Sequence, residues 1–220
     1  MDFNKDWIRE KLHLITPHDV QIPKNLHIIW VGDNPMPDYV MPNIEQWKHF
    51  MPDWNVRLWT NYDINVHEFP EDIVEKINES TIGAQKADIM RYFIVEKYGG
   101  FYMDTDTTPY RSLTPLTQLG FDLIVYHDNS VTWEYLCNSP FGASPHHPVV
   151  QTACTMIRGV TLNTSDPHLH TGPHLWGKSI AITPFFGKKI GVLSHQFFDK
   201  FDYFDGKYGS HTYAASWVTR

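Results

Sequence analysis

Hydrophobic residues recur along the first half of the chain in two periods, one typical of buried strands and one typical of helices. Short apolar runs rich in β-branched and aromatic residues predict strands at 25–31 (NLHIIWV), 54–60 (WNVRLWT) and 101–103 (FYM). Segments 38–52 and 82–98 instead place apolar residues three to five positions apart, which predicts helices. The first half therefore reads as alternating strands and helices.

The second half is more mixed. We expect strands at 121–127 and 136–143 and helices at 147–159 and 174–181, and the polar leader at 3–15 also has a helical pattern. The strand–helix–strand order of the first half predicts an α/β fold with a mostly parallel sheet. In such sheets ligands bind beyond the carboxyl ends of the strands.

Composition narrows the class of protein. The 220 residues carry a net charge of −7 and no basic run, so a nucleic-acid partner is not expected. The longest apolar runs are strand-sized, so no transmembrane segment is expected either. The N-terminus is mixed and acidic, unlike a secretory signal. Together these features predict a cytoplasmic location.

Cysteine and histidine offer weaker signals. Cys137 and Cys154 are the only cysteines, and we expect free thiols rather than a disulfide. A histidine cluster lies in a Thr/Pro/Gly-rich loop without cysteine or acidic companions, which favours solvated histidines over a zinc site: His168, His170 and His174.

The stretch GGFYMDTDTTP, residues 99–109, places two carboxylates one residue apart after a predicted strand. In an extended segment, side chains two apart point the same way, so Asp104 and Asp106 would face one site. Paired carboxylates suit a hard divalent ion, Mg²⁺ or Mn²⁺, whose open positions diphosphate oxygens fill. A solvated turn is the simpler alternative.

Three more residues can be interpreted either as structural or as functional. Asp88 and Arg91 are neighbours on one face of a mostly apolar helix. They form either a buried structural ion pair or a carboxylate for sugar hydroxyls beside a guanidinium for a phosphate or hydroxyl. Trp30, at the end of the first strand, is either a core residue or a flat surface for stacking a base.

The longer strings that contain these residues resemble one enzyme family. IPKNLHIIWVGDNPMPDYVMPNIEQWKHFMPDWNVRLWTNYD and AQKADIMRYFIVEKYGGFYMDTDTTP are similar to glycosyltransferases whose sugar-binding region contains a D-x-D motif. That family includes bacterial capsule-type transferases, yeast initiating mannosyltransferases and the glucosyltransferase domains of large clostridial toxins. The likeness is strong over 22–111 and weaker beyond. It implies a GT-A-type α/β fold, with a Rossmann-like, mostly parallel central sheet flanked by helices.

The resemblance also implies a donor site. Trp30 matches the tryptophan that stacks on the nucleotide base, and Asp88 and Arg91 match the pair that grips the donor sugar. Asn61 and Asn138 match less closely, as ribose- or sugar-side contacts.

The metal side of the site follows from the same resemblance. Asp104 and Asp106 match the D-x-D that binds the divalent ion and the diphosphate, with Asp106 the more direct ligand. Tyr102 matches a tyrosine that lines the site beside the metal, and His211 resembles a histidine that completes the metal shell in related retaining enzymes.

The family pattern places the remaining elements in the second half. Ser216 and Trp217 resemble a terminal Ser/Trp element that closes over the diphosphate. We therefore expect one catalytic domain over 1–220, with a nucleotide-sugar-binding half at 22–111 and an acceptor-side half at 112–220.

The expected activity is metal-dependent, retaining transfer of a hexose from a nucleotide sugar to a glycan or other hydroxyl acceptor. The donor is a UDP-sugar, with GDP-mannose as the alternative, and the cofactor is Mn²⁺ or Mg²⁺. Asp104, Asp106 and Arg91 would act on the reacting diphosphate.

Two other functions fit part of the sequence. DTDTT matches the first motif of haloacid-dehalogenase-type phosphohydrolases, with Asp104 as nucleophile and Asp106 as acid/base. That motif normally opens its domain, whereas about a hundred patterned residues precede it here. A catalytically silent sugar-nucleotide-binding module is the other alternative. Release of inorganic phosphate, or binding without release of nucleoside diphosphate, would distinguish these two from a transferase.

Overall fold

The protein is built around one six-stranded sheet, described here from a computed structural model. The structure describes residues 22–64, 66, 68–127, 136–162, 170–184, 188–194, 197–198 and 208–212. The strands of the central sheet are β1 (Asn25–Ile29), β2 (Asn55–Trp59), β3 (Gly100–Tyr102), β5 (Leu123–His127), β6 (Leu136–Ala143) and β7 (Ile190–Ser194), in the spatial order β2-β1-β3-β6-β5-β7.

The sheet is mostly parallel, and its one reversal lies at the centre. The strand β1 pairs in parallel with β2 and β3, and β5 pairs in parallel with β7. The strand β6 runs antiparallel between β3 and β5. A separate two-stranded ribbon joins β4 (Thr107–Pro109) to β8 (Gly209–His211). Strands from both halves of the chain therefore meet along the β3–β6 pairing.

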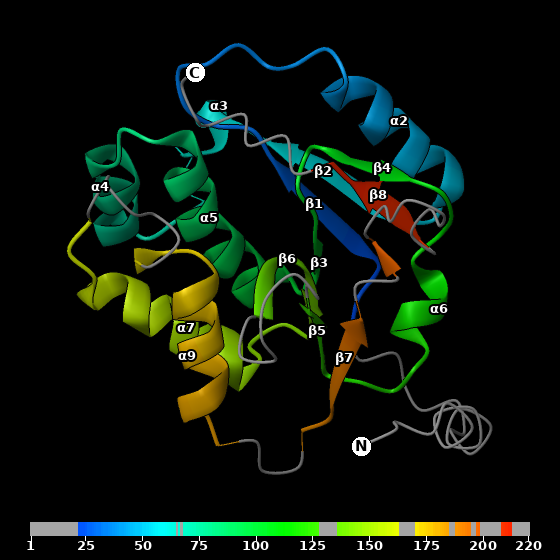
Figure 1. Cartoon of the computed structure of the whole chain (residues 1–220). Helices are drawn as coiled ribbons and strands as arrows, with labels where there is room; N and C mark the ends of the chain where they lie inside the picture. Colours follow the sequence, from blue (N-terminus) through cyan, green and yellow to red (C-terminus); the bar gives the residue numbers. More distant parts are fainter. Residues whose placement is uncertain are drawn as a thin grey trace.

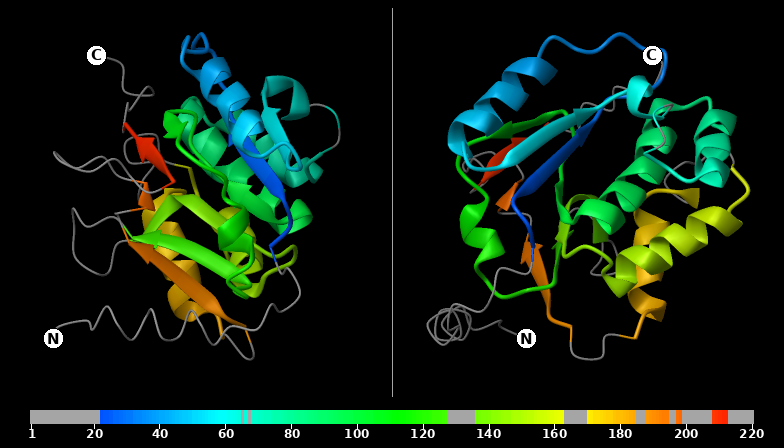
Figure 2. Two further views of the ribbon diagram at one scale, coloured as in Figure 1. Left: turned by 90° about the vertical axis from the view of Figure 1, so that its right-hand side faces the viewer. Right: turned by 180° about the vertical axis from the view of Figure 1, so that it is seen from behind.

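Helices cover both faces of the sheet (Figures 1 and 2). One face carries α4 (Glu71–Glu79), α5 (Gly83–Tyr98), α7 (Pro148–Gly159) and α9 (Pro173–Ile182), and the other carries α2 (Val40–Phe50) and α6 (Thr114–Thr117). The one-turn helix α3 (Asn61–Ile64) follows β2 at its carboxyl end.

Strand alternation sends side chains into two hydrophobic cores. Leu26 and Phe101 pack on the α2 side, whereas Tyr102 and Phe141 pack with the helices of the α5 side. This alternation directs Tyr102 toward α5, where the predicted sugar-binding residues lie.

The helix α5 is buried over most of its surface, because it lies between the sheet and the neighbouring helices. It begins at Gly83, where an added Cβ would lie 2.5 Å from the carbonyl oxygen of Val31. Only glycine allows this close approach, which sets the start of α5 against the end of β1. The helix ends at Tyr98 and is capped by Gly99, whose φ of +60° reverses the chain into β3.

The expected fold is confirmed in its elements and its parallel first half. The leader at 3–15 lies outside the described residues. Cys137 and Cys154 are buried free thiols, as expected. Within the residues described, none of the helices has the length and apolar character needed to cross a bilayer.

Candidate active site

The D-x-D motif forms a tight turn at the centre of the sheet. Asp104 and Asp106 lie between β3 and β4, and the Thr107 N–H donates to the Asp104 carbonyl at 3.2 Å. The Asp104 N–H donates to Ser139 Oγ at 3.1 Å, which attaches the turn to β6. The segment is a turn rather than the extended segment expected from the sequence, yet both carboxylates reach one place.

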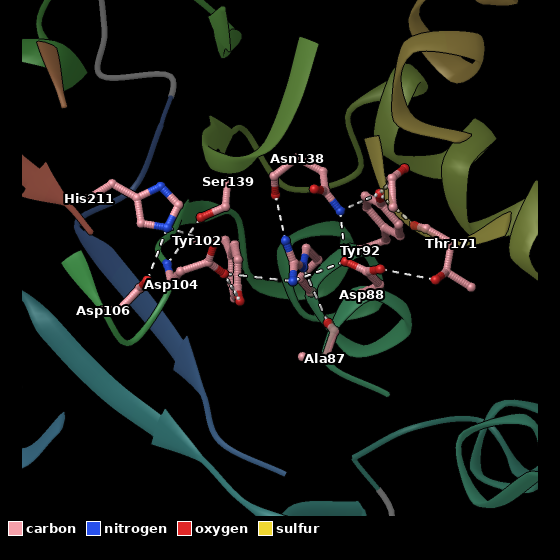
Figure 3. Close-up of polar contacts among 12 residues, drawn as sticks. Ala87, Asp88, Tyr92, Tyr102, Asp104, Asp106, Asn138, Ser139, Thr171 and His211 are labelled. Atoms are coloured by element: carbon pink, nitrogen blue, oxygen red, sulfur yellow. Dashed lines mark hydrogen bonds and ion pairs between the residues drawn. The ribbon is translucent and has the colours of Figure 1, made fainter. Parts of the chain in front are cut away.

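His211, from β8, lies next to the two carboxylates. The pairing of β4 with β8 sets Thr107 opposite His211. His211 Nε2 lies 3.0 Å from Asp106 Oδ1 and 3.6 Å from Asp104 Oδ2 (Figure 3). Thr212 Oγ1 also donates to the carbonyl oxygen of Asp106 at 3.3 Å. One ligand atom from each of the two aspartates and the histidine falls within 4.8 Å of the others.

This donor set fits a divalent cation. Two carboxylates and one imidazole offer the oxygen-rich, mixed ligands that Mn²⁺ accepts, and Mg²⁺ shares the carboxylate preference. The side chains of Asp106 and His211 are only 11% and 10% exposed, whereas the Asp104 side chain keeps 27% of its surface exposed. Three protein ligands leave coordination positions for a ligand that enters from the exposed side. Among the described residues, this is the group of His, Cys, Asp and Glu side chains arranged to hold a metal ion.

The buried cation Arg91, on α5, lies next to the candidate metal-binding cluster of Asp104, Asp106 and His211. Arg91 Nη2 lies 3.0 Å from Asp88 Oδ1 and 3.7 Å from Asp104 Oδ1. Its Cζ stands 4.2 Å from the centre of the Tyr102 ring, and the Tyr102 hydroxyl donates to Asp104 Oδ1 at 2.7 Å. Burial opposes the charge on Arg91, but Tyr102 and Asp88 outweigh it and raise the pKa of the guanidinium. Arg91 therefore stays charged between the two carboxylates.

Asp88 is enclosed by hydrogen-bond donors. Asn138 Nδ2 donates to its Oδ1 at 2.8 Å, and Thr171 Oγ1 donates to its Oδ2 at 3.0 Å (Figure 3). Burial raises the pKa of the Asp88 carboxyl, while Arg91 and these two donors act in the opposite direction. The result is a fixed, buried carboxylate next to the D-x-D turn.

A backbone contact fixes the position of Arg91. Arg91 Nη1 donates to the Asn138 carbonyl oxygen at 2.9 Å, so Asn138 holds both members of the Asp88–Arg91 pair. Tyr92 extends this contact, because its hydroxyl accepts from Asn138 Nδ2 at 3.1 Å and donates to the Thr171 carbonyl at 3.0 Å. Segments more than 40 residues apart thus converge on α5.

Trp30 and Asn61, the residues predicted to contact the nucleotide, hydrogen-bond to the loop that follows β1. Trp30 is partly exposed just past β1, and its indole Nε1 donates to the Asn34 carbonyl at 3.2 Å. Asn61 exchanges two hydrogen bonds with the Gly32 backbone, both 2.9 Å, which hold the loop after β1 against α3. Stacking by Trp30 and a ribose contact by Asn61 stay predictions.

Two predicted site residues lie outside the described part of the chain, and three residues of the site were not predicted from the sequence. Ser216 and Trp217 lie outside the described residues. Ser139, Tyr92 and Thr171 were not predicted as site residues, and of the three only Tyr92 stands inside the quoted strings that carry the family resemblance. Their contacts join residues 35 to 83 positions apart, which no local pattern reveals.

Part of the chain matches a known protein family. Residues 37–125 match the family described as glycosyltransferase sugar-binding region containing DXD motif. The matched segment includes Asp88, Arg91 and both aspartates of the motif. This segment is similar to the sugar-binding region of D-x-D glycosyltransferases.

Several curated proteins are similar to part of this chain. "Uncharacterized glycosyltransferase L373" of Acanthamoeba polyphaga mimivirus is 31% identical over 132 residues, which cover 58% of this chain and 52% of that protein. "Mannosyl phosphorylinositol ceramide synthase SUR1" of Saccharomyces cerevisiae is 27% identical over 145 residues, covering 64% of this chain and 36% of that protein. The chain thus spans about half the length of the first of these relatives and about a third of the second.

Solved structures share the fold. The UDP-bound glycosyltransferase domain from the YGT toxin superposes with a TM-score of 0.55 at 10% identity, covering 80% of each chain. The catalytic domain of alpha-toxin from Clostridium novyi gives a TM-score of 0.52 at 10% identity, covering 80% of this chain and 75% of that one. The GT-A glycosyltransferase fold expected from the sequence is confirmed.

Proposed function

We propose that the protein is a metal-dependent glycosyltransferase that transfers a hexose from a nucleotide sugar to a hydroxyl acceptor with retention of anomeric configuration. The observation that carries the proposal is the junction at Arg91, which lies between Asp88 and the Asp104 carboxylate of a candidate metal-binding cluster. A donor diphosphate at the cluster would place its sugar next to Asp88.

Each side chain has a role in this proposal. Asp104, Asp106 and His211 would hold Mn²⁺ or Mg²⁺, which when bound stabilises negative charge on the leaving diphosphate. Arg91 adds a fixed positive charge beside Asp104, in a buried site where such charges act strongly. Asp88 would accept hydrogen bonds from hydroxyls of the sugar.

The surroundings of Asp88 favour binding over covalent catalysis. Its two oxygens already receive hydrogen bonds from Asn138 and Thr171 and face Arg91, and these contacts lower the nucleophilicity of a carboxylate. We infer that Asp88 positions the sugar and that the acceptor attacks the face from which the diphosphate leaves. This route gives retention without an enzyme nucleophile.

At the nucleotide end, Trp30 would stack on the base and Ser216 and Trp217 would close over the diphosphate. UDP is the favoured nucleotide, and a toxin domain of the same fold was solved with UDP bound. Relatives named as mannosyltransferases, including "Inositol phosphoceramide mannosyltransferase 3" of Schizosaccharomyces pombe, keep GDP-mannose among the donors to be tested. A glycan or another hydroxyl compound would be the acceptor.

The haloacid-dehalogenase alternative is not supported. It required Asp104 as the nucleophile of a phosphohydrolase domain, whereas the chain has the glycosyltransferase fold. The match of residues 37–125 to a sugar-binding region also disagrees with it.

Titration calorimetry tests the proposed function. UDP and GDP are titrated with and without Mn²⁺, and the nucleotide that binds directs a hydrolysis assay with UDP-glucose, UDP-galactose, UDP-N-acetylglucosamine and GDP-mannose. We expect metal-dependent binding of one nucleotide and release of its diphosphate from a sugar nucleotide. Binding without any release would instead indicate a silent binding module, and absence of binding to both nucleotides would contradict the proposal.

A further inference from the structure

The turn before α9 forms part of the wall around Asp88. Thr171 is fully buried, and it comes just before Gly172, which caps the amino end of α9. The Tyr92 hydroxyl donates to the Thr171 carbonyl at 3.0 Å, while Thr171 Oγ1 donates to Asp88 Oδ2 at 3.0 Å. Two bonds in opposite directions therefore fix this turn to α5.

The donors around Asp88 are divided between its two oxygens. Oδ1 receives Asn138 Nδ2 at 2.8 Å and faces Arg91 Nη2 at 3.0 Å, whereas the hydrogen bond to Oδ2 comes from Thr171. A carboxylate that is hydrogen-bonded at one oxygen alone can rotate about its Cβ–Cγ bond. The bond from Thr171 to the second oxygen opposes that rotation.

Rotation of Asp88 would affect the metal side as well. Arg91 Nη2 stands between Asp88 at 3.0 Å and Asp104 at 3.7 Å, so it already lies closer to Asp88. If Asp88 turned both oxygens onto the guanidinium, the pair would become bidentate, a strongly favoured geometry for arginine. Arg91 would then move away from Asp104.

We propose that Thr171 is a positioning residue for the donor sugar, acting through Asp88. This inference rests on the proposed function, in which Asp88 receives the hydroxyls of the sugar. The Thr171 hydroxyl orients the Asp88 carboxylate and keeps Arg91 shared between Asp88 and Asp104. A segment from the second half of the chain thereby sets the geometry of a sugar site built on the first half.

The variant that tests this is Thr171→Val, which keeps the shape of the side chain and removes the hydroxyl. Using the best wild-type donor of the four-compound panel, we expect kcat/KM for donor hydrolysis to fall about 10- to 100-fold, as for loss of a hydrogen bond to a charged group. The Kd of the nucleoside diphosphate with Mn²⁺ should change much less than kcat/KM, because the Thr171 hydroxyl bonds to Asp88 and affects the diphosphate side through Arg91. Thr171→Ser, which restores the hydroxyl, should restore most of the rate.

The matched control lies at the other end of the same helix. Thr183 is also buried, and its hydroxyl donates to Thr152 Oγ1 at 2.9 Å, away from the residues around Asp88. Thr183→Val measures the cost of deleting a buried threonine hydroxyl from this region without touching the site. We expect it to keep the wild-type kcat/KM. Thermal unfolding of each variant shows whether it is folded, and Thr171→Ala paired with Thr183→Ala replaces the valine pair if Thr171→Val does not fold.

A double-mutant cycle tests the route of action. If Thr171 acts through Asp88, Thr171→Val should have little further effect in an Asp88→Asn background. A folded Thr171→Val enzyme with wild-type kcat/KM, an equal loss in Thr183→Val, or full additivity with Asp88→Asn would each overturn the inference. If the wild-type protein binds neither nucleotide, the proposed function is overturned together with this inference. That result comes from the wild-type titration, before any variant is made.

Discussion

The two sides of the candidate site hold their carboxylates in different ways. On the proposed sugar side, Asp88 is buried and interacts with a guanidinium, an amide and a hydroxyl of the protein itself. On the proposed metal side, Asp104 and Asp106 bring two carboxylates to one histidine at the turn that follows β3, a central strand of the sheet. The first arrangement balances its charge with the chain's own residues, and the second concentrates negative charge in one place.

Because of this difference, substitutions on the two sides should affect different properties, the stability of the fold on one side and the activity on the other. A buried carboxylate that is already paired belongs to the folded core, so its removal leaves a buried cation and costs stability. Two carboxylates that repel each other lower the free energy of unfolding when no cation is present, and an ion that binds the folded state raises it again. The sugar side should therefore tolerate substitution poorly, and the metal side should tolerate it structurally but not functionally.

The largest effect on folding is expected for Asp88→Asn. The substitution leaves Arg91 buried beside a neutral amide, and losing one partner of a buried pair costs about 3–5 kcal/mol. Urea unfolding with linear extrapolation measures the free energy of unfolding. Asp72→Asn is the control, since Asp72 pairs with Arg158 at the surface, with 55% of its side chain exposed. Its cost should be about 0–1 kcal/mol, and similar losses for the two variants would remove the distinction between the two regions.

The largest effect on activity without loss of fold is expected for Asp106→Ala. Turnover should fall on the order of 100- to 1,000-fold, as when a group that stabilises transition-state charge is removed. The metal-free protein should unfold at the wild-type temperature or above it, because one of two repelling carboxylates is gone. Full activity in a folded Asp106→Ala protein would show that the aspartate pair is not a metal site.

Metal addition should stabilise the wild-type protein. At a Mn²⁺ concentration a hundred times the Kd, the gain in unfolding free energy is about 2.7 kcal/mol for an ion that binds only the folded state. We expect scanning calorimetry to show this shift in the wild-type protein and in Thr183→Val, but not in Asp106→Ala or His211→Ala. An equal shift in His211→Ala would mean that His211 is not a ligand.

Much of the fold follows from local patterns, but the site depends on contacts that these patterns do not record. The predicted helix at 82–98 is α5 almost residue for residue, because its apolar spacing and the following glycines both mark it. The helix α4 was not predicted, although Ile73 and Ile77 show the same spacing after Pro70. The ribbon of β4 and β8 was also missed, since three-residue strands carry too little pattern.

The sequence also left the direction of strands open. Alternating side chains look alike in parallel and antiparallel strands, so β6 could be predicted as a strand without its reversed direction. That reversal brings Asn138 and Ser139 beside α5 and the D-x-D turn. Family resemblance identified Asp88, Arg91 and the aspartates as a set, but the donor from Thr171 became visible only in three dimensions.

The smallest effect is expected at the nucleotide end, where Trp30 lies outside both charged regions. If the indole stacks on the base, Trp30→Ala should weaken binding of the nucleoside diphosphate by roughly 1–3 kcal/mol, and Trp30→Phe should recover part of that loss. Titration calorimetry with saturating Mn²⁺ measures both. Because Trp30 is partly exposed and its Nε1 bonds to the backbone of Asn34, the stability of the metal-free protein should change little. A large loss of stability with unchanged nucleotide affinity would assign Trp30 to the core, and would leave the base to be bound by other residues.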